Sequence, residues 1–284
     1  MKRLAWAPGL AAALLAAVTL YSPSPASADG GTPAHLNWCS LLTDALRAQT
    51  LAGQTTNGAG LQLNACVSDK VILWKEDGNV FSENRTVCGQ HVTIQLKHAY
   101  GWSDTTIKTK FGSTSPTAEK WYNDIVANQG FSRVGNVWDI APGDIFAINY
   151  KDDPSSNYPT TTGHCGIVNS VGPIYTYTFT SNGVTIRYRD LEIFDSTSAV
   201  HSYDNRIFQA GELGAGSAYT EWTGAGRGYM RIYVDASDNY LGYTWSMTGN
   251  KAQPPGTPSS WTYYNNNFKP ESLRHFAVGR VTVP

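Results

Sequence analysis

Residues 85–101 read Arg-Thr-Val-Cys-Gly-Gln-His-Val-Thr-Ile-Gln-Leu-Lys-His-Ala-Tyr-Gly, and the rest of the chain is interpreted around this stretch. Its apolar positions recur at intervals of four, four and three residues, which places them on one helical face: Cys88, Val92, Leu96 and Ala99. We predict that Thr86 caps this helix and that Gly101 ends it.

The predicted helix holds Cys88 in its first turn. With Thr86 as the cap, Cys88 is the second helical residue, where unpaired backbone N–H groups and the positive end of the helix dipole favour a thiolate. A lone cysteine is more often a small buried hydrophobic residue, so its position alone does not assign chemistry. Residues further along the chain have to decide between these two interpretations.

The first 28 residues have the pattern of an export signal. Lys2 and Arg3 form a basic start, residues 10–20 are apolar, and Ala26-Ser27-Ala28 is a small-x-small cleavage motif. The apolar run is too short for a membrane anchor. We therefore expect a secreted or periplasmic protein that has no membrane contact after processing. The formal net charge of −1, without a long basic run, argues against a nucleic-acid partner.

Four cysteines follow the cleavage motif: Cys39, Cys66, Cys88 and Cys165. In an oxidising compartment they would form disulfides, and four cysteines allow three pairings. If Cys88 is a nucleophile it must stay free, and Cys39 with Cys66 is then the natural pair, contributing roughly 3–4 kcal/mol. The chain has no Cys-x-x-Cys or His-x-x-x-His spacing, so we expect no metal site.

A second helix is predicted after Ser115-Pro116, with Ser115 as its cap and Gly130 as its stop. The pattern beyond it is typical of strands, at 145–148, 163–168, 175–179, 184–188, 191–195, 230–234, 240–247 and 276–283. The alternation predicts that His164 and Val168 share one face of their strand while Cys165 takes the other. The glycines at 224–228 lack a Walker lysine, so we interpret them as turn residues rather than a phosphate loop.

Three short motifs occur in a fixed order: Cys88-Gly89-Gln90-His91-Val92 with Tyr100-Gly101, then Pro142-Gly143-Asp144-Ile145, then Gly163-His164-Cys165-Gly166-Ile167-Val168. Together they resemble the papain-like cell-wall hydrolases of the NlpC type and the related cysteine, histidine-dependent amidohydrolase/peptidase family, over about residues 80–200. The resemblance implies an α+β, papain-like fold, in which N-terminal helices pack on an antiparallel sheet with extra C-terminal strands. Residues 29–66 would form an N-terminal extension and residues 67–284 the hydrolase domain.

The resemblance also implies a catalytic machinery that needs no cofactor. Cys88 would be the nucleophile and His164 the general base and then acid, while the Cys88 backbone N–H would contribute to an oxyanion hole. A third polar group would orient the imidazole, and we choose Asp195 because it ends an apolar strand after the His164 strand. His201 and Asp204 are nearby substitutes, and Asp195 has a structural alternative as a cap of the turn that follows it.

The sequence departs from the NlpC type at the nucleophile, where Asp-Cys-Ser-Gly is usual and Val87-Cys88-Gly89-Gln90 stands here. The cleaved bond is therefore open. We expect a secreted cysteine amidase or peptidase that acts on peptide amides, with peptidoglycan stem peptides as candidate substrates. The helix neighbours Gln90 and His91 are expected to be solvated, and the oligomeric state is not predicted.

Two alternatives remain. One is a transglutaminase-like acyltransferase with the same catalytic residues and an amine acceptor. The other is a non-enzymatic extracellular binding protein with a structural Cys88–Cys165 disulfide. In the C-terminal part, several aromatic residues are candidates for stacking on sugars, although sheet packing explains them better: Tyr229, Tyr233, Tyr240, Tyr243, Trp245 and Trp261.

Overall fold

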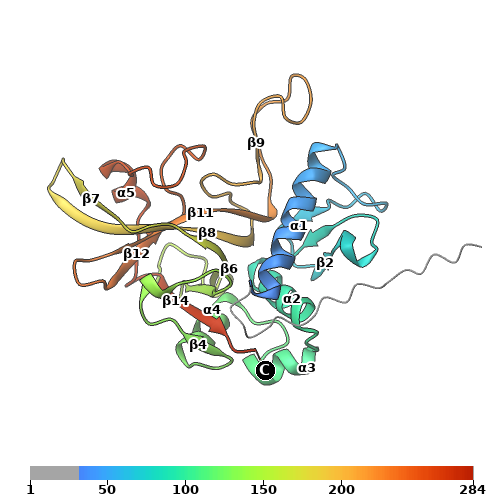
Figure 1. Cartoon of the computed structure of the whole chain (residues 1–284), viewed down its shortest axis with the longest axis horizontal. Coiled ribbons are helices and arrows are strands. Elements are labelled where there is room, and N and C mark those ends of the chain that lie inside the picture. The colour runs from blue at the N-terminus through green and yellow to red at the C-terminus, as the bar shows by residue number, and fades with distance from the viewer. Residues whose placement is uncertain (1–31, 284) are drawn as a thin grey trace, which may run out of the picture.

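The structure, a computed structural model, describes residues 32–283. The expected export signal at 1–28 lies outside these residues. Within the described part of the chain, no helix has the length and apolar character that crossing a membrane requires. The fold is α+β, with helices in the N-terminal half and one large antiparallel sheet built mainly from the C-terminal half (Figure 1).

The N-terminal half supplies four helices and a small three-stranded sheet. The helices are α1 (Ala34–Leu51), α2 (Cys88–Tyr100), α3 (Asp104–Phe111) and α4 (Ala118–Val126). Strands β1 (Asn64–Ala65), β3 (Glu83–Arg85) and β2 (Val71–Leu73) pair in that order, and a 3-10 turn, η1 (Lys75–Asp77), follows β2. Helix α1 lies in the segment expected as an N-terminal extension, and its Leu36 and Cys39 enter the same core as Val92 of α2.

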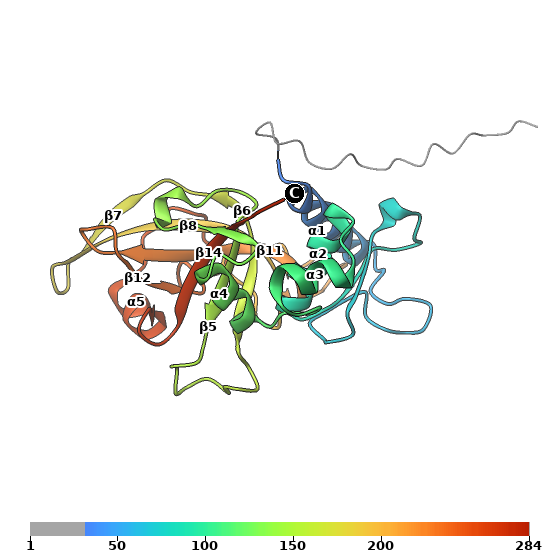
Figure 2. The ribbon, with the colours of Figure 1, turned by 90° about the horizontal axis from the view of Figure 1, so that it is seen from below.

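The large sheet has nine strands in the order β13-β12-β11-β8-β6-β5-β14-β4, with β7 paired to β8. The strands are β4 (Phe131–Arg133), β5 (Ile145–Asn149), β6 (Gly163–Val171), β7 (Tyr175–Phe179), β8 (Val184–Thr197), β11 (Gly224–Val234), β12 (Tyr240–Thr244), β13 (Lys269–Pro270) and β14 (His275–Val281). Outside it lie η2 (Val137–Asp139), helix α5 (Trp261–Asn267) and a two-stranded ribbon of β9 (Ile207–Phe208) and β10 (Thr220–Glu221). Figure 2 shows α1, α2 and α3 gathered at one end of the sheet, with β7 and α5 at the other.

Alternation along the strands divides the sheet into two buried faces. Ile145, Cys165 and Ile167 pack with the helices, whereas Phe146, Val168 and Ile193 belong to a second core on the opposite face. The predicted alternation of the His164 strand is therefore confirmed. The hairpin predicted around Ser181-Asn182-Gly183 is also confirmed, since β7 and β8 pair from Phe179↔Val184 to Tyr175↔Tyr188.

The helix starts differ from the sequence prediction. Val87, not Thr86, is the N-cap of α2, because the Thr86 hydroxyl instead donates to Asn84 Oδ1 at 2.7 Å. Cys88 is therefore the first helical residue. In α4 the cap is Thr117, whose side chain accepts from Lys120 N–H, and the helix ends at Val126 before reaching the predicted stop. Gly101 does end α2, in the left-handed conformation with φ 63°.

Two interpretations of the C-terminal part also change. The glycines at 224–228 are not turn residues, because they form the first half of strand β11. The proposed sugar-stacking aromatics are largely internal, since Tyr233 and Tyr243 are buried in two different cores. Trp245 packs edge-on against the His164 ring, with ring centroids 4.6 Å apart. These aromatic residues pack the sheet and do not form a row on one face.

Candidate active site

Cys88 lies at the start of α2, half-buried against the core between the helices and the sheet. The first backbone hydrogen bond across the start of α2 runs from His91 N–H to Val87 O at 2.9 Å. The N–H groups of Cys88, Gly89 and Gln90 precede that bond, so they have no acceptor within the helix. Gly89 is required by packing, because a Cβ there would lie 2.6 Å from Pro116 O. The thiol therefore sits beside backbone donors that can hold a negative charge.

His164, on β6, approaches Cys88 from the sheet. Its Nε2 lies 2.8 Å from Asp195 Oδ2 on the adjacent strand β8. That contact leaves Nδ1 as the ring nitrogen available to the Cys88 thiol. His164 and Asp195 are almost completely buried, so their hydrogen bond is shielded from water. The structure thus brings together the three side chains that the sequence selected as catalytic.

The charges of Cys88 and His164 support each other. A hydrogen bond from the Cys165 thiol and the positive charge of His164 outweigh burial and hold the pKa of Cys88 well below its usual range. Burial alone would lower the pKa of His164, but the Cys88 thiolate and the Asp195 carboxylate outweigh it and raise that pKa to about 9. The pair is therefore a thiolate and an imidazolium at neutral pH.

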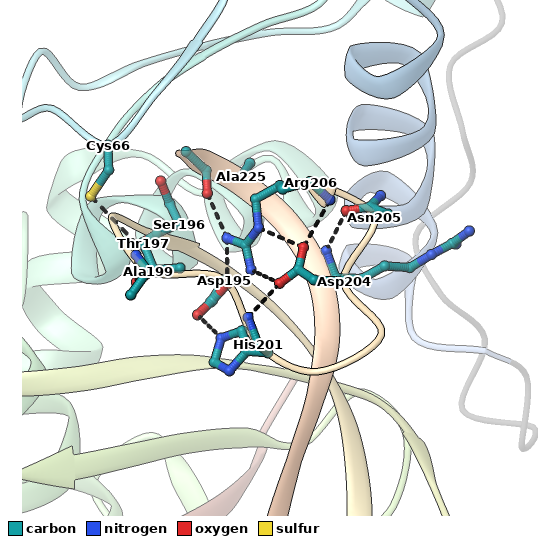
Figure 3. A network of polar contacts seen from close by, with 12 residues as sticks. Cys66, Asp195, Ser196, Thr197, Ala199, His201, Asp204, Asn205, Arg206 and Ala225 are labelled. Atoms are coloured by element: carbon teal, nitrogen blue, oxygen red, sulfur yellow. Dashed lines mark hydrogen bonds and ion pairs between the residues drawn. The ribbon is translucent and has the colours of Figure 1, made fainter. Parts of the chain in front are cut away.

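Asp195 is held by two further cationic side chains. His201 Nε2 lies 2.8 Å from the same oxygen, Oδ2, and Arg206 Nη1 lies 2.9 Å from Oδ1 (Figure 3). Burial would raise the pKa of Asp195, but the positive charges of Arg206 and His201 outweigh it and keep that pKa well below its usual range. Asp195 is therefore a permanently ionised carboxylate rather than a turn cap.

His201 carries a proton on each ring nitrogen. Its Nδ1 lies 3.0 Å from the backbone carbonyl oxygen of Trp245, and its Nε2 faces the ionised Asp195 carboxylate. Neither partner can donate a hydrogen bond, so both contacts require an N–H on the imidazole. The Trp245 ring also packs against both imidazoles, with its centroid 4.4 Å from that of His201 and 4.6 Å from that of His164.

Asp204 balances the charge of Arg206. The Arg206 guanidinium donates to both carboxylate oxygens of Asp204, at 2.8 Å and 2.6 Å, and to Gly224 O at 2.7 Å. Two of the β11 glycines make room for this buried group. A Cβ at Gly226 would collide with the Arg206 side chain, and a Cβ at Gly228 would lie 2.6 Å from Asp204 Oδ2. The glycine-rich stretch at 224–228 is thus explained by the charged network beside it.

A cavity of about 410 Å³ opens next to Cys88. Its walls are residues 87–90 at the start of α2, residues 115–118 before and into α4, and residues 159–163 in the loop that leads into β6. The cavity gives a substrate a route to the thiol from the side where β6 begins.

The remaining cysteines and histidines of the sequence prediction take different places. All four cysteines within residues 32–283 are free thiols, so the expected Cys39–Cys66 bridge is not formed. Cys39 is enclosed in the helical core, whereas Cys66 Sγ contacts Ser196 O at 3.9 Å. His91 was expected in solvent but is completely buried, and burial lowers its pKa to about 4.

Sequence reasoning missed how the Asp195 network is assembled. His201 and Asp204 were considered only as replacements for Asp195, but they act together with it, and Arg206 was not considered. The signal present in the sequence is the run of polar and charged residues after β8, at 201, 204 and 206, opposite the glycines at 226 and 228. Such a pairing becomes interpretable only when β8 and β11 are known to be neighbours.

Comparison with known proteins gives little further assignment. No protein-family model matches the chain, and no solved structure matches it significantly. The chain is similar to the uncharacterized protein R653 of Acanthamoeba polyphaga mimivirus, with 26% identity over 184 residues that cover 59% of this chain and 74% of that protein. This similarity assigns neither a family nor an activity, so the function has to be argued from the site.

Proposed function

We propose that this protein is a secreted cysteine amidase or peptidase of papain-like type, related to the NlpC-type cell-wall hydrolases. The observation that carries the proposal is the buried chain of contacts from Cys88 through His164 to Asp195, with His164 Nε2 2.8 Å from Asp195 Oδ2. A cysteine whose pKa is lowered, at a helix start and open to a cavity, is the arrangement that nucleophilic thiol catalysis requires.

The chemistry follows from the charges at the site. The Cys88 thiolate attacks the carbonyl carbon of a peptide amide, forming a C–S bond and an oxyanion that the free N–H groups at the start of α2 stabilise. His164 then gives its proton to the amide nitrogen, the C–N bond breaks and the amine leaves. Water attacks the thioester with His164 as the base. The C–S bond breaks, the acid is released and the thiolate is restored.

The order of the site along the chain supports the family proposal. The nucleophile begins a helix, the histidine lies near the start of a strand, and the orienting carboxylate lies on the adjacent strand. Peptides of the cell wall are the substrates that this resemblance suggests. The binding-protein alternative required a Cys88–Cys165 disulfide, and both residues are free thiols here. An acyltransferase would use the same site with an amine in place of water.

The test is product analysis with the full mature chain. Purified peptidoglycan fragments and a mixed peptide library are incubated with wild type and with Cys88→Ala, and new amino and carboxyl termini are identified by mass spectrometry. New termini formed only by the wild type support a hydrolase. Incorporation of an added primary amine in place of free acid would identify an acyltransferase instead. If both proteins leave every fragment intact and Cys88 is no more reactive than an ordinary thiol, the proposal fails.

A further inference from the structure

The cavity beside Cys88 is lined without a single formal charge. Its thirteen lining residues are glycine, proline, alanine, valine, the cysteine itself, one glutamine and five hydroxyl residues. The hydroxyls come from Ser115, Thr117 and residues 160–162. A charged group moved from water into such a site loses hydration and gains no opposite charge. The lining therefore favours neutral ligand groups.

Gln90 supplies a specific reason for preferring a donor. Its side chain lines the cavity and is only 9% exposed, and within residues 32–283 its Oε1 has no hydrogen-bond partner. A buried acceptor without a donor costs about 1–3 kcal/mol, which a bound N–H group would recover. An ionised carboxylate offers only acceptor atoms and cannot do so.

Two helices begin at this cavity, and their positive ends could attract an anion. At the start of α2 that potential is already used by the Cys88 thiolate. At the start of α4 it is balanced by Glu119, a carboxylate in the first turn that also accepts from Tyr158 Oη at 3.2 Å. The helix ends therefore do not turn the cavity into an anion site.

We infer that the cavity selects a neutral peptide segment next to the cleaved bond, one that gives an N–H to Gln90 Oε1, and that it rejects a carboxylate in the same place. The inference rests on the proposed function. For cell-wall peptides it means that amidated side chains beside the cleaved bond are accepted and the corresponding free acids are disfavoured.

The experiment uses a matched pair of peptidyl chloromethyl ketones that differ only in glutamine or glutamate next to the reactive carbon. Second-order rate constants for Cys88 alkylation are measured for each probe, with iodoacetamide labelling of Cys88 as a separate measure of thiol activation. We expect the glutamine probe to react at least tenfold faster. Thr161→Lys, which places a positive charge on the wall, should reduce this ratio, and the size-matched control Thr161→Gln should preserve it.

The outcomes separate the two proposals. If neither probe nor iodoacetamide reacts with Cys88 faster than with an ordinary thiol, the proposed function fails and the inference fails with it. If iodoacetamide reveals an activated Cys88 but the two probes react equally, the glutamate probe reacts faster, or neither peptidyl probe reacts, the proposed function survives and the inference is overturned.

Discussion

His201 Nε2 and His164 Nε2 lie at the same distance, 2.8 Å, from one oxygen of Asp195. The imidazole that serves the thiol therefore shares its carboxylate with a second imidazole that never contacts the thiol. Because His201 also donates to Trp245 O at 3.0 Å, it fixes the orientation of that carboxylate relative to the sheet. We interpret His201 as a positioning residue that acts through Asp195.

Replacing His201 should weaken catalysis through Asp195. We expect His201→Ala to lower kcat/KM by roughly ten- to hundredfold, the range seen for residues that orient a site from behind. Because His201 helps to lower the pKa of Asp195, its removal should raise that pKa and move the acid limb of the pH–rate profile upward.

The conservative His201→Gln variant, which keeps an N–H donor, should recover part of the rate but not the position of the acid limb. His98→Gln, near the end of α2 and stacked on Trp74, is the matched control and should leave that limb unchanged. An acid limb that stays in place in His201→Ala would show that His201 has only a structural role.

Removing either member of the thiolate–imidazolium pair should abolish hydrolysis. Cys88→Ala deletes the nucleophile, and His164→Ala deletes the acid and base, so kcat should fall below detection in both. Secretion and the thermal midpoint should stay near those of the wild type. Full activity in either variant, measured on a substrate that the wild type cleaves, would refute the assignment of the site.

The glycines of β11 should prove intolerant of even a methyl group. In Gly228→Ala the new Cβ would lie 2.6 Å from Asp204 Oδ2 and 2.9 Å from His201 Cβ, so the charged network has to shift. We expect a loss of roughly 1–3 kcal/mol in the free energy of unfolding, together with lower activity. Gly135→Ala is the control, since a Cβ there meets nothing within 4 Å. Equal stabilities of the two variants in denaturant unfolding would contradict this packing.

Burial of His91 should make the protein sensitive to acid. Burial lowers the pKa of His91 from 6.5 to about 4 in the folded state, so the unfolded chain takes up a proton first as the pH falls. Stability is therefore lost between pH 6.5 and about 4, by an amount on the order of 3 kcal/mol for this residue.

Urea unfolding of His91→Leu across this pH range is the measurement. Its stability should depend less steeply on pH than that of the wild type. The remaining slope should come in part from His35, whose pKa is also lowered to about 4 by burial. An identical slope in wild type and variant would mean that His91 is protonated or exposed in the folded protein.

Local patterns in the sequence predicted the elements that hold the site. The face through Val92 and Leu96 and the glycine at position 101 located α2, and strict alternation located His164 on the face opposite Cys165. These features depend on neighbours along the chain, which periodicity reports directly. For the same reason the pairing of β7 with β8 followed from its turn residues.

The parts that failed depend on contacts between distant residues. Thr86 does not cap α2 because Asn84 takes its hydroxyl, and His91 is buried although its helical position looked polar. The network that holds Asp195 needs β11 beside β8, a neighbourhood that no spacing in the sequence encodes. Cys39 and Cys66 seemed a natural pair along the chain, but one lies in the core and the other beside Ser196.

The most direct test of the account is per-cysteine alkylation of the non-reduced protein with iodoacetamide across pH 4–10, read by mass spectrometry in wild type and His164→Ala. Cys88 should react far below the usual thiol pKa of about 8.5, and the reactivity should change again near pH 9, where His164 loses its proton. In His164→Ala the low-pH reactivity should disappear. A Cys88 that titrates like an ordinary thiol, reacts identically in both proteins, or is found bridged to another cysteine would contradict the thiolate–imidazolium pair.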